Sequence, residues 1–185
     1  MPINIGDKPQ ADFNHPLDLM MDCHRRIERF LLVLQKVAQA PVLDGQNRAA
    51  LRAVLDYFKI SGPRHNQDEE QSLLPAMLAS GNVAVAEAVG QLNRLAADHG
   101  IAEELHQRLG VLAEEWLSTG VISEENRREL KGLIASLIGL YQPHIAMEER
   151  EIFPLASRVL APQALTTIGE QMRQRRQSRL GPVKK

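Results

Sequence analysis

The sequence predicts an all-α protein, an up-down-up-down four-helix bundle followed by a short fifth helix at the C-terminus. Aromatic residues make up only 4% of the 185 residues, while leucine and alanine are abundant, which favours helix–helix packing by aliphatic side chains over a β-rich core. Apolar residues recur three and four positions apart over long stretches, as on one face of an α-helix. Short connections between such helices indicate antiparallel neighbours.

The first two helices follow from this periodicity and from the prolines. The first is expected over residues 16–40, because a proline at position 16 suits the first turn of a helix. The second is expected over residues 47–79. Gly62 and Pro63 interrupt it, and because proline removes a backbone hydrogen bond, they predict a kink just before His65.

The remaining helices are expected over residues 83–117, from Ser123 to Leu160, and over residues 162–176. Ser123 is a good N-cap, and acidic residues follow it in the first turn, where the helix dipole favours them. Pro75 is expected to distort the last turn of the second helix, because its ring clashes with the preceding turn.

A chain of this length predicts one domain. We expect an N-terminal extension over residues 1–14, a four-helix bundle over 15–160, and a short helix with a basic tail over 161–185. The tail from residue 173 onward is expected to be solvated, with polyanion binding as the weaker alternative. A net charge of −1 provides no field that would attract nucleic acid or an anionic membrane, and no apolar run approaches the roughly 18 residues of a membrane helix.

The single cysteine, Cys23, excludes an internal disulfide, and residues 1–13 lack the pattern of a secretion signal. Together these features predict a cytoplasmic protein without nucleic-acid or membrane partners. The sequence leaves the oligomeric state open and is compatible with a homodimer.

Four of the six histidines are followed by a glutamate four residues later. Residues four apart lie on the same face of an α-helix, so each pair can point an imidazole and a carboxylate at the same place. Imidazole and carboxylate together are ligands for iron, manganese or zinc. The four pairs are His24/Glu28, His65/Glu69, His99/Glu103 and His144/Glu148.

These histidines are predicted to lie in one layer of the bundle, near one of its ends. In antiparallel neighbours, residues equidistant from the connecting turn have the same height. His24 and His65 lie about 20 and 21 residues from the first turn, and His99 and His144 about 22 and 23 residues from the third. Burying this layer without a metal would leave polar groups unpaired at a cost of several kcal/mol, so we expect one or two metal ions.

Four segments resemble the hemerythrin-like, or HHE cation-binding, domains: HPLDLMMDCHRRIE, RHNQDEEQSLLP, DHGIAEELH and PHIAMEEREIFPLA. The shared pattern is a lone histidine followed by HxxxE, twice over, and it spans about residues 15–160. The resemblance implies a non-haem centre of two iron ions, with manganese and zinc left open. The ligands that it implies are His24, His65, Glu69, His99, His144 and Glu148.

The resemblance also implies that the two glutamates bridge the irons. One division of the histidines places His24 and His65 on one iron and His99 and His144 on the other, although the spacing alone does not require it. The small ligands that the family implies are O2, NO or peroxide, which the protein would bind or sense. An iron-sensing or iron-handling regulatory module, an iron–sulfur-repair protein and a metal-free helical scaffold are the alternatives, and the sequence does not decide between an enzyme and a regulator.

The sequence departs from the marine oxygen carriers of this family at two places. Those proteins have two histidines four apart on the third helix, where this chain has His99 and Glu103. They also have an aspartate five residues after the last histidine, where this chain has Glu149. Glu103 is therefore a candidate seventh ligand, and a carboxylate-richer site argues against a simple oxygen carrier.

Two further residues are candidates for roles near the metal. Tyr141 lies one turn before His144 and is expected in the core or as a hydrogen-bond donor to a bound oxygen species. His106 is about 10 Å along the helix from His99, too far to share its metal, so it is expected in the core or just outside the ligands.

The other candidates have simpler expected roles. Glu28 is expected on the surface, and Glu70 and Glu149 are expected to face away from the site, although either can rotate toward it. His15 is expected at the start of the first helix. Cys23 is expected to face outward, with a redox role as the minor alternative.

Overall fold

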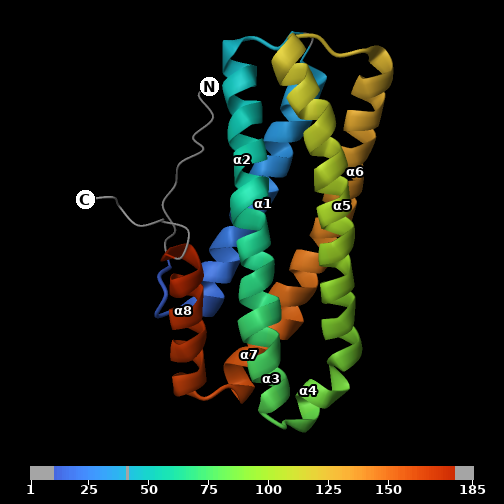
Figure 1. Cartoon of the computed structure of the whole chain (residues 1–185). Coiled ribbons are helices and arrows are strands. Elements are labelled where there is room, and N and C mark those ends of the chain that lie inside the picture. The colour runs from blue at the N-terminus through green and yellow to red at the C-terminus, as the bar shows by residue number, and fades with distance from the viewer. Residues whose placement is uncertain (1–10, 41, 178–185) are drawn as a thin grey trace, which may run out of the picture.

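The computed structural model describes residues 11–40 and 42–177, and this part of the chain is an all-α bundle, as predicted (Figure 1). Its long antiparallel segments are joined by short connections. They are α1 (Pro16–Gln39); α2 (Gly45–Asp68) with η1 (Glu69–Leu73) and α3 (Leu74–Ala79); α5 (Val89–Thr119), preceded by α4 (Val83–Glu87); and α6 (Glu124–Met147) with η2 (Glu148–Ile152) and α7 (Phe153–Val159). The expected fifth helix is α8 (Pro162–Gln177).

Side-chain caps determine where two of these helices begin. Asp44 accepts a hydrogen bond from the backbone N–H of Asn47 at 2.7 Å, so α2 begins slightly earlier than expected. Ser123 accepts one from Asn126 at 3.0 Å, which confirms its predicted capping role at the start of α6. Gly120, with φ +76°, ends α5 in the left-handed conformation that favours glycine.

Two of the expected helices contain an unpredicted π-helical turn. The helix α2 continues as an α-helix through Gly62 and Pro63, so the interruption expected before His65 is absent. The irregular turn comes after the histidine instead, at η1, and its counterpart after His144 is η2. The expected helix over 83–117 is also divided, because Ala88 has ψ near 0°, which turns the chain between α4 and α5.

A layer of buried polar side chains divides the hydrophobic core into two clusters. The larger cluster includes Leu51, Trp116 and Leu137, and the smaller includes Met20 and Ile152. Buried polar groups are costly unless they are paired or bind a metal, so their concentration in one layer indicates a specific site. The buried polar and charged side chains among the described residues are His24, His65, Asp68, Glu69, Ser72, His99, His144 and Glu148.

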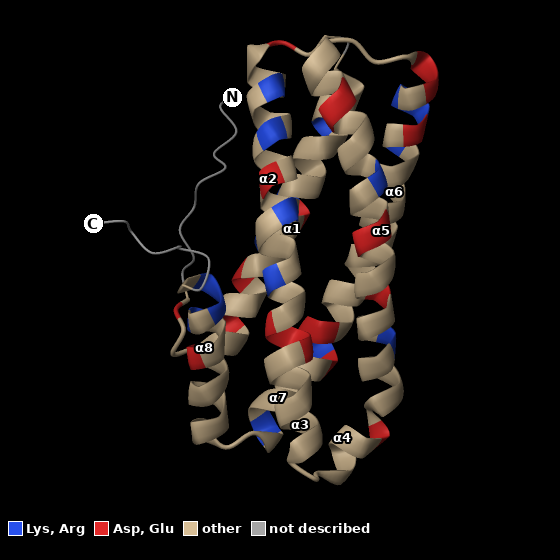
Figure 2. Ribbon diagram, in the orientation of Figure 1, with Lys and Arg blue, Asp and Glu red and all other residues tan. Residues whose placement is uncertain are grey.

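The helix α8 is attached to the bundle by charged contacts, and Figure 2 shows the basic residues at its C-terminal end. Arg175 and Arg176 donate to the two carboxylate oxygens of Asp68, at 2.8 and 2.7 Å, and Arg175 also donates to Ser72 Oγ at 2.5 Å. The expectation of a solvated tail from residue 173 is therefore wrong up to residue 177, because the buried Asp68 carboxylate holds two of its arginines. Residues 178–185 lie outside the described part of the chain.

The segment before α1 crosses α8 at very short range. A Cβ atom on Gly169 would lie 1.8 Å from the backbone oxygen of Phe13, so only glycine fits at this crossing. The Phe13 ring also lies beneath the guanidinium groups of Arg173 and Arg176, at 5.3 and 5.4 Å. Residues 1–10 of the expected N-terminal extension lie outside the described part.

Candidate metal centre

Six buried side chains from four helical segments converge in the polar layer. Their nitrogen and oxygen atoms form two overlapping groups, and within each group the atoms lie within 4.8 Å of one another. Glu69 and Glu148 belong to both groups. One group adds His24 and His65, and the other adds His99 and His144.

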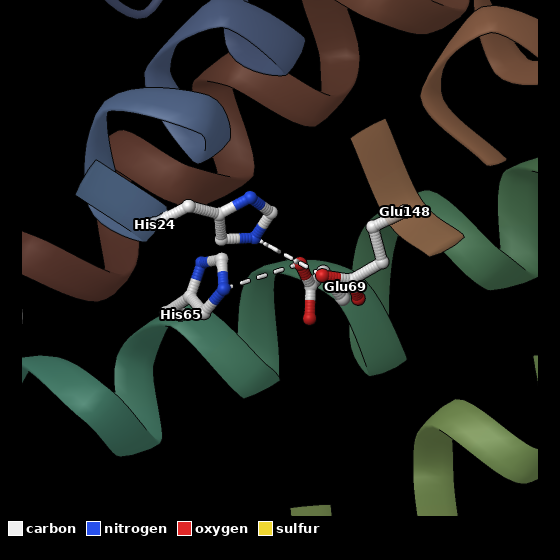
Figure 3. A group of neighbouring side chains, drawn as sticks. All are labelled: His24, His65, Glu69 and Glu148. Carbon is white, nitrogen blue, oxygen red and sulfur yellow. Dashed lines mark ion pairs between the residues drawn. The ribbon is translucent and has the colours of Figure 1, made fainter. Parts of the chain in front are cut away.

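The converging side chains come from α1, α2 with η1, α5, and α6 with η2. Figure 3 shows His24 of α1 and His65 of α2 pointing at Glu69 of η1 and Glu148 of η2. Nε2 of His24 lies 3.0 Å from Glu148 Oε2, and Nε2 of His65 lies 3.3 Å from Glu69 Oε1. Nε2 of His99 lies 3.3 Å from Glu69 Oε2, which completes the connection to the second group.

The converging atoms lie close together without satisfying one another. Within the part of the chain described, four of these atoms are buried and lack a hydrogen bond: both carboxylate oxygens of Glu69, Oε2 of Glu148 and Nε2 of His24. Nε2 of His99 and Nε2 of His144 face each other at 3.1 Å. Lone pairs that share a centre in this way fit a cation, and the mixture of imidazole and carboxylate suits iron, manganese or zinc.

The two shared glutamates stay ionised despite their burial. Burial raises the pKa of the Glu69 carboxyl, but His65, His24 and His99 outweigh it and hold the pKa well below its usual range. Burial and the charge of Glu69 raise the pKa of the Glu148 carboxyl, but the neighbouring imidazoles of His144 and His24 outweigh them and lower this pKa overall. Two carboxylates in the interior therefore require positive charge beside them.

The histidines supply that charge as protons when no metal does. Burial lowers the pKa of His24, but Glu148 and Glu69 outweigh burial and raise it to about 10. Burial likewise lowers the pKa of His99, and Glu69 and Glu70 raise it to about 9. His65 differs, because burial is the dominant effect and lowers its pKa. A metal cation would replace these protons as the partner of the carboxylates.

The π-helical turns place the glutamates, and a proline lies six residues after each of them. Pro75 follows Glu69, and Pro154 follows Glu148. A proline has no N–H and its ring clashes with the carbonyl four residues earlier, so the preceding turn widens. The widened turn brings successive side chains closer in direction. As a result, the glutamate and the residue after it both reach the polar layer.

That second residue binds a histidine on a neighbouring helix. Oε1 of Glu149 accepts a hydrogen bond from Nδ1 of His24 at 3.0 Å, and Oε1 of Glu70 accepts one from Nδ1 of His99 at 2.7 Å. The expectation that Glu70 and Glu149 face away is therefore wrong, because the wider turn rotates them toward the histidines. The repeated H-x3-E-E-x3-[L/F]-P pattern is the sequence signal that identifies them.

Asp98 is a functional candidate that the sequence reasoning missed. Its Oδ2 accepts a hydrogen bond from Nδ1 of His144 at 3.4 Å. It directly precedes His99 on α5, and that adjacency to a predicted ligand was the only available signal. Nδ1 of His65, by contrast, has no hydrogen-bond partner within the described residues.

Tyr141 and His106 form a pair on the side of the larger hydrophobic cluster. The Tyr141 hydroxyl and Nε2 of His106 share a hydrogen bond of 3.1 Å, and the His106 ring stacks on Phe58 at 4.1 Å. Tyr141 also meets the His144 ring edge-on, with centroids 6.3 Å apart. His106 therefore occupies the expected place just outside the ligands, and it holds the hydroxyl of Tyr141.

Four other candidates lie away from the converging atoms. Glu103 and Glu28 are exposed, and Glu103 accepts a hydrogen bond from the Gln107 side chain. His15 pairs with Asp12 at the start of α1. Cys23 is partly buried rather than turned outward, and burial raises the pKa of its thiol to about 11. A thiol that stays protonated is a poor nucleophile.

A comparison with known proteins covers the part of the chain that carries this layer. The family model described as the hemerythrin HHE cation-binding domain matches residues 15–156. The chain belongs to this family. A protein of Haemophilus influenzae, described as uncharacterized, is 29% identical over 170 residues, which cover 90% of this chain and 93% of the relative.

The hemerythrin HHE domain thus contains both overlapping groups, which are consistent with a dinuclear metal site. The match ends before α8 begins at Pro162, so the helix that binds Asp68 lies outside the matched residues. Within the residues described, none of the helices combines the length and apolar character needed to span a membrane.

Proposed function

We propose that this protein holds a non-haem di-iron centre and uses it to bind or sense a small oxidant, O2, NO or peroxide, in the cytoplasm. The observation that carries the proposal is the sharing of Glu69 and Glu148 between two groups of ligand atoms. A carboxylate with one oxygen toward each of two cations is the natural bridge between them. The other ligands in this proposal are His24, His65, His99 and His144.

The division of ligands follows the two groups. One ion would be held by His24 and His65, the other by His99 and His144, and both by the shared glutamates. Two neutral imidazoles and a share of two carboxylates would leave an open coordination position on each ion. Bound iron would supply the reducing electrons and the open coordination position that a small oxidant requires.

The chain's own residues prepare the surroundings of that position. The Phe153 ring stacks on His24 at 5.5 Å and covers one side of the layer. Met20 and Ile152 belong to the smaller hydrophobic cluster. Tyr141 belongs to the larger cluster, and its hydroxyl is turned to His106. An apolar enclosure of this kind excludes water and limits access to small ligands.

Aerobic reconstitution with ferrous iron tests the proposal directly. We expect two irons per chain by elemental analysis and an absorption band in the near ultraviolet and visible region that changes on addition of peroxide or NO. A double His65→Ala/His144→Ala variant is expected to lose the iron and the band, whereas Glu103→Gln keeps both, since Glu103 is exposed and bonded to Gln107. A colourless protein with less than one iron per chain contradicts the proposal, and manganese or zinc in the protein as purified reassigns the metal.

An iron-sensing regulatory role is the second candidate, and one contact favours it. Asp68, which holds Arg175 and Arg176 of α8, directly precedes Glu69. Occupancy of the metal position can therefore alter the support for α8. Amide hydrogen exchange with and without iron separates the two functions: protection of α8 that depends on iron supports sensing, and identical protection argues against it.

A further inference from the structure

Three of the four inward histidines have a carboxylate behind them. All four turn Nε2 toward the shared glutamates, so Nδ1 points outward. Glu149 lies behind His24, Glu70 behind His99, and Asp98 behind His144. These carboxylates are partly accessible to solvent, whereas the histidines are buried.

The carboxylates are distributed unequally between the two groups. In the group of His99 and His144, both rings have one, because Glu70 lies 2.7 Å from His99 and Asp98 lies 3.4 Å from His144. In the group of His24 and His65, only His24 has one. Nδ1 of His65 is buried and no described side chain accepts from it.

The carboxylates also cross from one half of the chain to the other. Glu70 follows the first HxxxE motif on η1, yet it binds His99 of α5. Glu149 follows the second motif on η2, yet it binds His24 of α1. In each pair of consecutive glutamates, the first therefore belongs to both proposed ion positions. The second accepts a hydrogen bond from the lone histidine of the opposite half of the chain.

A carboxylate behind a ligand histidine has a known effect on the metal. It fixes the ring orientation and the tautomer with hydrogen on Nδ1, and it makes Nε2 a stronger electron donor. Loss of such a partner commonly weakens metal binding by about 10- to 100-fold.

We infer that Glu70, Asp98 and Glu149 are positioning residues that rank the two metal positions, so that the position of His99 and His144 binds a divalent ion more tightly than that of His24 and His65. The inference rests on the proposed dinuclear site. With one more carboxylate behind its histidines, the tighter position is expected to exceed the other by about 10- to 100-fold in affinity.

Variants that isolate each position test the ranking. His24→Ala/His65→Ala leaves the position of His99 and His144, and His99→Ala/His144→Ala leaves the other. Zn2+ affinity is measured for each by competition with a chromophoric chelator, after circular dichroism shows that the metal-free variants are folded. Equal affinities, or tighter binding at His24 and His65, overturn the ranking.

Glu70→Gln and Glu149→Gln then test the crossed arrangement in both backgrounds. Glu70→Gln is expected to weaken Zn2+ binding about tenfold or more at His99 and His144 and to leave the other position unchanged, and Glu149→Gln does the reverse. General damage to η1 or η2 would weaken both positions, because Glu69 and Glu148 serve both, and that result overturns the inference. Glu151→Gln is the matched control on η2, since Glu151 is exposed and bonded to Gln91.

A second measurement in the otherwise intact chain does not depend on the double variants. The protein is loaded with two Zn2+ and its histidine nitrogens are labelled with 15N. Glu70→Gln is expected to shift the Nδ1 signal of His99 alone, and Glu149→Gln that of His24 alone. Failure of the unsubstituted protein to bind two Zn2+ contradicts the proposed function, whereas two bound ions with unmoved signals contradict only the inference.

Discussion

Arg175 on α8 donates from Nε to Oδ1 of Asp68 at 2.8 Å, and Asp68 is fully buried in the polar layer. Arg176 binds the other oxygen at 2.7 Å. This contact joins a helix outside the matched domain to the segment that carries Glu69. A buried carboxylate that loses its charged partners is strongly destabilising, so the contact is expected to contribute to the stability of the fold.

Replacement of Asp68 by asparagine is expected to lower the free energy of unfolding by about 2 kcal/mol, because an amide removes the charge but keeps part of the hydrogen bonding. Urea unfolding followed by circular dichroism measures the change. Arg52→Gln is the matched control, since its pair with Glu114 is half-exposed and should contribute less than about 1 kcal/mol. Equal effects of the two substitutions would contradict the importance of the Asp68 contact.

Gly169→Ala is expected to destabilise the protein by about 1 to 3 kcal/mol, because the new Cβ would collide with the backbone of Phe13. Gly132→Ala is the control, since Gly132 lies at an exposed position of α6 and nothing lies within 4 Å of its Cβ position. There the lower entropy of the unfolded chain should stabilise by about 0.5 kcal/mol or more. Thermal unfolding should therefore shift in opposite directions for the two variants.

His106 is expected to make stability depend on pH. Burial lowers its pKa from 6.5 to about 4, so between these values the unfolded chain binds a proton that the folded chain does not. The contribution of His106 to the free energy of unfolding is therefore fully present above about pH 6.5, and it is lost as the pH drops toward 4. From pH 7.5 to pH 5 the expected loss due to His106 is about 2 kcal/mol.

The contribution of His106 is obtained by comparing unfolding in urea with that of His106→Gln at both pH values, with both proteins free of metal. The variant should lose less stability than the unsubstituted protein on acidification. The same loss in both proteins would show that His106 is protonated as readily in the folded state as in the unfolded one.

Removal of the metal is expected to lower the melting temperature. A ligand present at about 1,000 times its Kd stabilises the folded state by about 4 kcal/mol, which corresponds to about 8–16 °C for a chain of this size. Scanning calorimetry with iron and with a chelator measures the difference. The Glu69→Ala/Glu148→Ala variant should melt at one temperature under both conditions, and a metal-dependent shift in that variant would argue for binding elsewhere.

The convergence of the six side chains could be predicted because it depends on helix periodicity and on the lengths of the connections. His24 and His65 are nearly equidistant from their turn, and so are His99 and His144, and a rise of 1.5 Å per residue then places them level. The predicted bundle and fifth helix followed from the same periodicity.

The π-helical turns were harder to predict, because the effect of a proline on a helix depends on where in the helix the proline lies. Pro63 is accommodated inside α2, whereas Pro75 and Pro154 each follow a π-helical turn. Propensity alone does not separate these cases, since every proline lacks the same donor. The widened turn directs Glu70 to His99. Because this turn was not predicted, Glu70 was wrongly expected to face away from the site.

The contacts of α8 depend on residues far apart in sequence. Arg175 and Asp68 are separated by 107 positions, and a basic run at a chain end more often stays in solvent. The periodicity of α8 predicted a helix but gave no information about which buried carboxylate it would meet.

Because Glu69 and Glu148 come from opposite halves of the chain, neither helical hairpin by itself contains all four residues of either group. The first hairpin, α1 with α2, lacks Glu148, and the second, α5 with α6, lacks Glu69. At the proposed centre, complete coordination of either metal ion would therefore require both hairpins to be docked, and a metal-dependent absorption band would report the last step of assembly rather than the first. Two separate fragments divided near Gly81 should reconstitute the centre only when they are mixed.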